Sequence, residues 1–85
     1  MSIYSTDSAM WDVFLKGYDK LLDMNPSPEL VDACEAIRRA LNQDYFSWIA
    51  DSIVSTWDYY YDQLYEQERE NFGYHLVDPL LDILR

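Results

Sequence analysis

The chain has 85 residues, of which 49% are hydrophobic and 16% aromatic, and its sixteen acidic side chains outnumber six basic ones to give a formal net charge of −10. That length suits a single domain with a modest core, and the aromatic content argues against a disordered chain. So acidic a surface repels nucleic acid and anionic membranes and attracts basic protein surfaces, so direct nucleic-acid binding is disfavoured.

Three features of the sequence indicate a soluble, cytoplasmic protein. The single cysteine, Cys34, rules out an internal disulfide and indicates a reducing compartment. The N-terminus lacks the positive region and apolar run of a signal peptide. No apolar run approaches the roughly 20 residues that a membrane-spanning helix needs. We therefore expect residues 1–85 to form one acidic helical domain that makes no membrane contact.

Apolar residues recur at helical spacing through residues 8–24, which predicts the first helix. The apolar stripe consists of Met10, Trp11, Phe14, Leu15, Tyr18, Leu21 and Leu22. Gly17 lies at the edge of this stripe. It either permits close approach of a neighbouring helix or is incidental, at a cost of about 1 kcal/mol in helix stability.

The tetrapeptide 25–28, Asn-Pro-Ser-Pro, is the clearest boundary in the sequence. Its asparagine can end a helix in the left-handed conformation, and the proline after it cannot continue that helix. Its serine is then expected to cap a second helix over 28–41, with the second proline in the first helical position. Leu30, Cys34, Ile37 and Leu41 form the expected buried line of that helix.

The segment 43–70 is expected to form one long helix with two opposite faces. The apolar face consists of Phe46, Ile49, Ile53, Trp57, Tyr60 and Leu64. Steps of four and seven residues place a set of acids within an arc of about 80° on the other side. These acids are Asp44, Asp51, Asp58, Asp62 and Glu66, and Trp48 and Tyr59 lie among them. The pairs 51–52 and 55–56 offer alternative caps, at which the segment would divide and separate the acids.

Gly73 is expected to end the long helix, and Asp78-Pro79 to begin a short final helix over 79–84. That end is almost entirely apolar, so it either docks on the core or stays exposed and mediates a dimer. The predicted fold is therefore all-α: a small compact bundle of three main helices and a short fourth, with no sheet.

No residue pattern predicts chemistry. His75, the only histidine, follows a glycine turn, where a capping or surface role is usual, and Cys34 lies on an apolar line typical of a core residue. A hard cation could touch two of the three aligned acids Asp58, Asp62 and Glu66, but no calcium-loop pattern or histidine partner supports a metal site. Phosphate-binding loops and zinc spacings are absent. We expect no catalytic residue, no metal ligand and no cofactor, and the chain is not expected to be an enzyme.

The acidic face carries the functional hypothesis, with a solvated face that only confers solubility as the alternative. The predicted partner-binding residues are Asp44, Trp48, Asp51, Asp58, Tyr59, Asp62 and Glu66. Carboxylates beside a tyrosine suit recognition of Arg and Lys. On one straight helix this array would span about 33 Å, close to one turn of B-DNA at roughly 34 Å, so it could imitate a phosphate backbone.

In size, acidity and helical make-up the chain resembles, in a general way, phage and plasmid DNA mimics that block restriction or CRISPR effectors. It also resembles the immunity proteins of colicin nucleases. Tyr59 to Tyr61 are similar to the tyrosine pair of those immunity proteins, but the proline and acidic loop that accompany the pair are absent, so no functional residue is carried over.

The resulting hypothesis is an inhibitor or decoy that binds a basic, nucleic-acid-binding protein such as an effector or nuclease. One alternative is an immunity protein or antitoxin for a single toxin. Another is a self-associating structural or adaptor subunit that forms a homodimer through Trp11, Tyr4 or the 80–84 end.

Overall fold

The computed structural model describes residues 2–43 and 46–84, and it describes side chains in 8–43 and 48–84. The elements are α1 (Ser2–Leu22), α2 (Pro28–Gln43), α3 (Phe46–Tyr60), α4 (Glu66–Phe72), the π-helix η1 (Gly73–Val77) and α5 (Asp78–Leu84). The described ranges contain no strand. The predicted all-α bundle is therefore confirmed.

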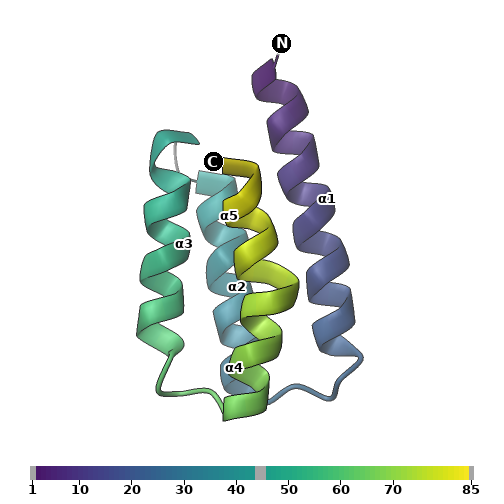
Figure 1. Cartoon of the computed structure of the whole chain (residues 1–85), viewed down its shortest axis with the longest axis vertical. Helices are drawn as coiled ribbons and strands as arrows, with labels where there is room; N and C mark the ends of the chain where they lie inside the picture. Colours follow the sequence, from purple (N-terminus) through teal and green to yellow (C-terminus); the bar gives the residue numbers. More distant parts are fainter. Residues whose placement is uncertain (1, 44–45, 85) are drawn as a thin grey trace.

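The helices enclose one core, with α1 and α3 on the two flanks of the continuous α4–η1–α5 segment and α2 behind it (Figure 1). Helices α1 to α3, the turn that follows α3, and the α4–η1–α5 segment all contribute to the core. Its fully buried side chains include Phe14, Leu21, Leu30, Ile37, Ile53, Phe72, Leu76 and Leu80. The first turns of α1 extend beyond the other helices (Figure 1), because α1 begins at Ser2 and not near residue 8 as predicted.

The joint between α1 and α2 follows the sequence prediction. Asn25 has a φ of 55°, the left-handed conformation in which asparagine ends helices. Ser27 Oγ accepts a hydrogen bond from the Leu30 backbone N–H at 3.2 Å, so this serine caps α2. The serine in turn donates from its backbone N and its Oγ to the two carboxylate oxygens of Glu68 in α4, both at 2.7 Å.

The single long helix predicted over 43–70 is wrong, because α3 ends at Tyr60 and α4 begins at Glu66. The break lies at neither of the two predicted caps but at residues 61–65, which form a turn that carries no glycine or proline. Arg69 holds this turn: its Nε donates to the Tyr61 carbonyl at 2.9 Å, and its guanidinium lies 4.1 Å from the centre of the Tyr61 ring. Leu64 keeps the buried position predicted for it and is 4% exposed, although it lies in the turn.

The predicted helix end at Gly73 is correct for the α-helix, since α4 ends at Phe72, but the helical chain does not stop there. Gly73 begins the π-helix η1, which leads directly into α5 at Asp78. A Cβ at this position would lie 3.3 Å from ring atoms of Trp57, so the glycine permits close packing of η1 against α3. The apolar 80–84 end packs against the core: Leu80 is fully buried, and Leu81, Ile83 and Leu84 are partly buried.

The close approach predicted at Gly17 is confirmed. A Cβ on Gly17 would overlap the carbonyl oxygen of His75, so only glycine lets α1 cross η1 at this separation. The predicted apolar stripe of α1 is partly wrong: Met10, Phe14 and Leu21 are buried, whereas Leu15 and Leu22 are exposed.

Candidate functional site

The predicted partner-binding residues are divided between two helices and the turn that joins them. Helix α3 carries Trp48, Asp51, Asp58 and Tyr59, the turn carries Asp62, and Glu66 is the first residue of α4. All six side chains are exposed, and Asp44 lies outside the described residues.

The acids do not share one helical face as predicted. Asp51 and Asp58 are two turns apart on α3 and so point in nearly the same direction. The 15 residues of α3 extend about 22 Å at 1.5 Å per residue, so the helix does not carry an array of about 33 Å, and the expected match to one turn of DNA is wrong. Asp62 and Glu66 lie past the end of α3, on the turn and at the start of α4, and both are exposed.

Two exposed aromatic residues accompany the acids on α3. The Tyr59 side chain is 69% exposed and that of Trp48 60%. The Tyr59 ring packs edge-on against the half-buried ring of Tyr60, with 4.9 Å between centroids, and Gln63 Nε2 donates to the Tyr59 carbonyl at 2.9 Å. The backbone and ring of Tyr59 are thus held in place while its surface stays open, as in an aromatic anchor of a binding surface.

The turn adds two aromatic residues that sequence reasoning did not include. Tyr65 is 73% exposed and Tyr61 42%. A continuous helix would have directed Tyr61 toward the core, so its exposure follows only from the break after Tyr60. The guanidinium of Arg69 already lies over the Tyr61 ring.

The carboxylates of this surface have no cationic partner within the described part of the chain. The ion pairs that the structure shows there lie on α1 and α2: Lys16 with Asp12 at 3.1 Å, and Arg38 with Glu35 at 2.9 Å. The Glu35 carboxylate, unlike those of the acidic surface, is paired: hydrogen bonds from Arg38 and Tyr18 hold the pKa of Glu35 below its usual range. Asp51, Asp58, Asp62 and Glu66 are therefore available to cations of a partner.

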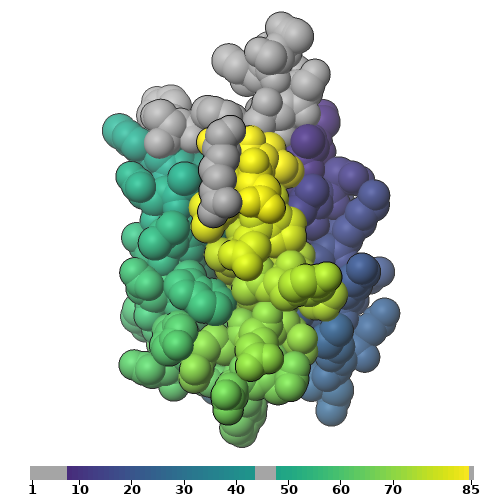
Figure 2. All heavy atoms as spheres, in the orientation of Figure 1, coloured from purple at the N-terminus to yellow at the C-terminus, as the bar shows by residue number. Residues whose placement is uncertain are grey.

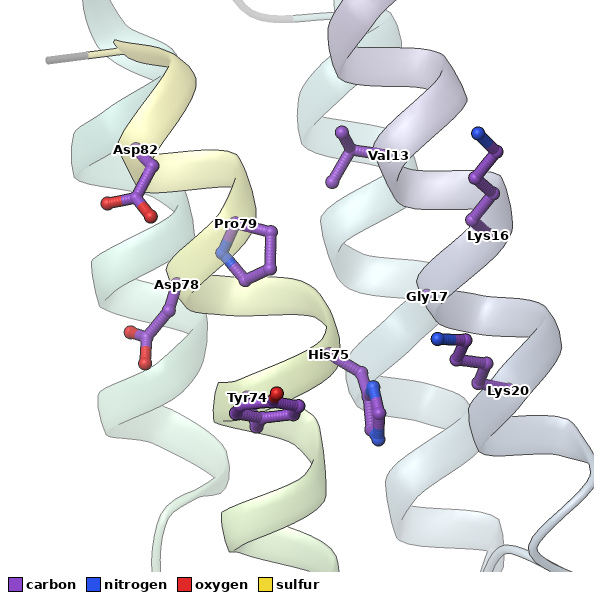
Figure 3. A pocket seen from close by; sticks show the side chains of 9 residues that line it. All are labelled: Val13, Lys16, Gly17, Lys20, Tyr74, His75, Asp78, Pro79 and Asp82. Carbon is purple, nitrogen blue, oxygen red and sulfur yellow. The ribbon is translucent and has the colours of Figure 1, made fainter.

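Cys34 and His75 lie apart from this surface. Cys34 is completely buried, and that burial raises the pKa of its thiol to about 12, so the thiolate needed for reactivity is not formed near neutral pH. His75 lines a groove of about 500 Å³ between α1 and the η1–α5 segment, where Lys20 extends toward it and its ring contacts Tyr74 edge-on at 5.0 Å (Figure 3). Across residues 2–43 and 46–84, no three His, Cys, Asp or Glu side chains form a group able to hold a metal ion.

The helices between residues 2 and 84 that the structure describes include none that is both long and apolar enough to cross a membrane. No protein-family model, no curated protein and no solved structure matches the chain.

Proposed function

We propose that this chain is a non-enzymatic binding protein that inhibits or sequesters a basic protein through the acidic surface formed by Asp51, Asp58, Tyr59, Asp62 and Glu66, with Trp48 beside it. One observation carries the proposal: these carboxylates are exposed, form no ion pair within the described chain, and lie beside exposed aromatic rings. Such a surface offers charge for attraction and rigid rings for anchoring.

The partner class follows from the charge. A protein surface rich in Lys and Arg is most often one that binds nucleic acid, because phosphates require those residues. An acidic protein that covers such a surface blocks it sterically and electrostatically, with no chemical step. Attraction between opposite charges makes association fast and sensitive to salt.

The proposal is tested first by capture of partners from a lysate of the source cells at low and moderate salt, with the captured proteins identified by mass spectrometry. We expect one nucleic-acid-binding effector or nuclease, released by salt and displaced by added DNA. The purified pair then allows the association rate to be measured with the double variant Asp58→Lys, Asp62→Lys. We expect that rate to fall by about tenfold or more.

The matched control is Asp19→Lys, Asp23→Lys, which makes the same change of charge at the same spacing on two exposed positions, one near the end of α1 and one in the turn after it. Because α1 and α3 lie on opposite flanks of the bundle (Figure 1), the control should reduce the rate far less. Equal effects of the two double variants would show that only net charge matters and would contradict the proposed surface. A single tightly bound toxin as the captured partner would favour the immunity-protein form of the same mechanism.

A second candidate function is self-association, which is favoured by two exposed leucines on α1. Leu15 is 58% exposed and Leu22 47%, and both lie on one side of that helix. The 80–84 end, by contrast, packs against the core, with Leu80 buried and Leu81, Ile83 and Leu84 partly buried. Sedimentation over a range of concentrations separates the two functions, because a dimer weakened by Leu15→Asp would support self-association.

A further inference from the structure

A small apolar groove lies between α3 and the η1–α5 segment. The atoms of these segments are neighbours on the face of the molecule that Figure 2 shows. The groove has a volume of about 220 Å³, and its lining residues are Val54, Trp57, Gly73, Val77, Asp78 and Leu81. Five of these six are apolar or glycine. The volume is below the roughly 300–1,000 Å³ typical of sites for small molecules, so the groove better fits one side chain of a larger partner.

The floor of the groove is fixed in place. The Trp57 ring stacks on the buried Phe72 ring at 6.0 Å and contacts Tyr61 edge-on at 5.6 Å. Gly73 lies against the same indole, where a Cβ would stand 3.3 Å from its atoms. Val54, one turn before Trp57, is 44% exposed at the edge. A preformed apolar floor loses little conformational freedom when a side chain binds to it.

Both sides of the groove carry carboxylates. On α3, Asp51 and Asp58 are exposed and lie one turn before and one turn after Val54. On α5, Asp78 lines the groove and is exposed, and it also lines the neighbouring groove toward α1 (Figure 3). Neither α3 nor α5 contains a Lys or Arg residue. The groove is thus apolar at the base and acidic along both edges.

We propose that this groove receives an apolar side chain of a basic amphipathic helix in the partner protein, with Lys and Arg of that helix on the carboxylates of α3 and α5. The inference rests on the proposed function and adds to it the form of the partner segment. Charge complementarity selects a basic segment, and the apolar floor selects one whose apolar residues share a face. Those two requirements together describe an amphipathic helix that lies in a groove.

The test uses two synthetic peptides and the full chain labelled with ¹⁵N. The first peptide is a basic helix with leucines at i, i+4 and i+7 among lysines. The second has the same composition and charge, with leucines placed on different faces. We expect the first to bind about tenfold more tightly. It should shift the Gly73 amide and the Trp57 indole signals and leave unchanged the amide of Gly17, which lies on α1.

Substitution of one groove residue supplies the second measurement. Val54→Ser removes apolar surface at a partly exposed position and should weaken binding of the amphipathic peptide about fivefold while binding of the scrambled peptide stays the same. Met24→Ser is the matched control, because Met24 is similarly exposed, at 47%, and lies in the joint after α1. Thermal melts of both variants verify that each is folded.

The outcomes separate this inference from the proposed function. Equal binding of both peptides, with no effect of Val54→Ser, would rule out the groove as the binding site for the apolar side chain. The proposed function, which rests on charge attraction, would remain. Shifts confined to the signals of Trp48 and Tyr59 would place the contact on another part of α3 and would also overturn the groove. If neither basic peptide binds, both proposals fail.

Discussion

Two joints lie at the same end of the bundle (Figure 1), and they are built in different ways. The joint 23–27 uses residues whose own conformational preferences bend the chain: Asn25 in the left-handed region and Ser27 as a cap. The joint 61–65 has no such residue. It is held from outside by Arg69, which donates to the carbonyls of Tyr61 and Leu64 at 2.9 and 3.4 Å.

Neighbouring residues of α4 reach the two joints. Glu68 accepts two hydrogen bonds from the cap of α2, and Arg69 donates to the turn after α3. The two joints therefore differ in what determines their conformation. The conformational preferences of the joint's own residues determine the first, and α4 stabilises it further, whereas the second depends on contacts from α4. Four substitution experiments test that difference.

Arg69→Ala should have the largest effect, a loss of about 2 kcal/mol of unfolding free energy, because it removes hydrogen bonds from a charged group and a cation–π contact. Urea denaturation measures the loss. Arg39→Ala is the control, since Arg39 is exposed, and it should stay within about 0.5 kcal/mol of the parent. Equal losses in the two variants would show that the second joint does not depend on Arg69.

Ser27→Ala and Glu68→Gln should each cost about 1 kcal/mol, through loss of a helix cap and of a charge-assisted hydrogen bond. Because the two side chains bond to each other, the double variant should cost less than the sum of the single ones. Glu70→Gln, at an exposed position of the same helix, serves as the control. Additive losses would mean that α4 does not reinforce the first joint.

Tyr18→Phe should cost about 1 kcal/mol near neutral pH by removing the 2.8 Å hydrogen bond to Glu35, which ties α1 to α2 beside the first joint. The cost should depend on pH. Burial and that bond raise the pKa of Tyr18 to about 12, so the advantage of tyrosine is complete below its ordinary pKa of about 10 and is lost as pH rises toward 12.

Acid should also remove the advantage of Tyr18, because the pKa of Glu35 is lowered in the folded chain. The stability contributed by this carboxylate is present above its unfolded pKa and disappears as pH falls through the folded value. Urea denaturation of both proteins from acid to alkaline pH checks these limits. A difference that stays constant across this range would contradict the assigned bond.

Asn25→Gly should have the smallest effect, within about 0.5 kcal/mol, since glycine adopts the left-handed conformation freely but gains entropy in the unfolded chain. Asn25→Ala should cost about 1 kcal/mol because a Cβ opposes that conformation without the local hydrogen bonding of asparagine. Thermal melts compare the two variants. Equal stability of both would show that the positive φ of Asn25 does not direct the first joint.

The same contrast explains which parts of the fold could be predicted. The helix ends around residues 25–28 follow from local preferences, and so they were predicted correctly. Residues 61–65 have no residue that favours a turn, and the hydrogen bonds that hold the turn come from Arg69, which lies beyond it in the sequence. The end of the α-helix before Gly73 was predicted, but the packing role of Gly73 was not, because its contact with the Trp57 ring depends on a residue 16 positions away.

The candidate site was predictable residue by residue but not as a whole. Exposure of Asp51, Asp58 and Tyr59 follows from helical periodicity, and the structure agrees. The directions of Asp62 and Glu66 depend on where α3 ends. The groove between α3 and α5 could not be predicted at all, since it requires the pairing of two helices that are separate in sequence.

The hydrogen bonds from Glu68 and Arg69 of α4 to the two joints also have a consequence for the order of folding. Arg69 and Tyr61 are 8 residues apart, whereas Ser27 and Glu68 are 41 apart. Closing a short loop costs less chain entropy than closing a long one, so the α3–α4 hairpin can assemble before α1 and α2 are docked. During synthesis from the N-terminus, the first two helices emerge without the acidic carboxylate that completes their joint. The bundle can close only after α4, which carries Glu68, has been synthesised.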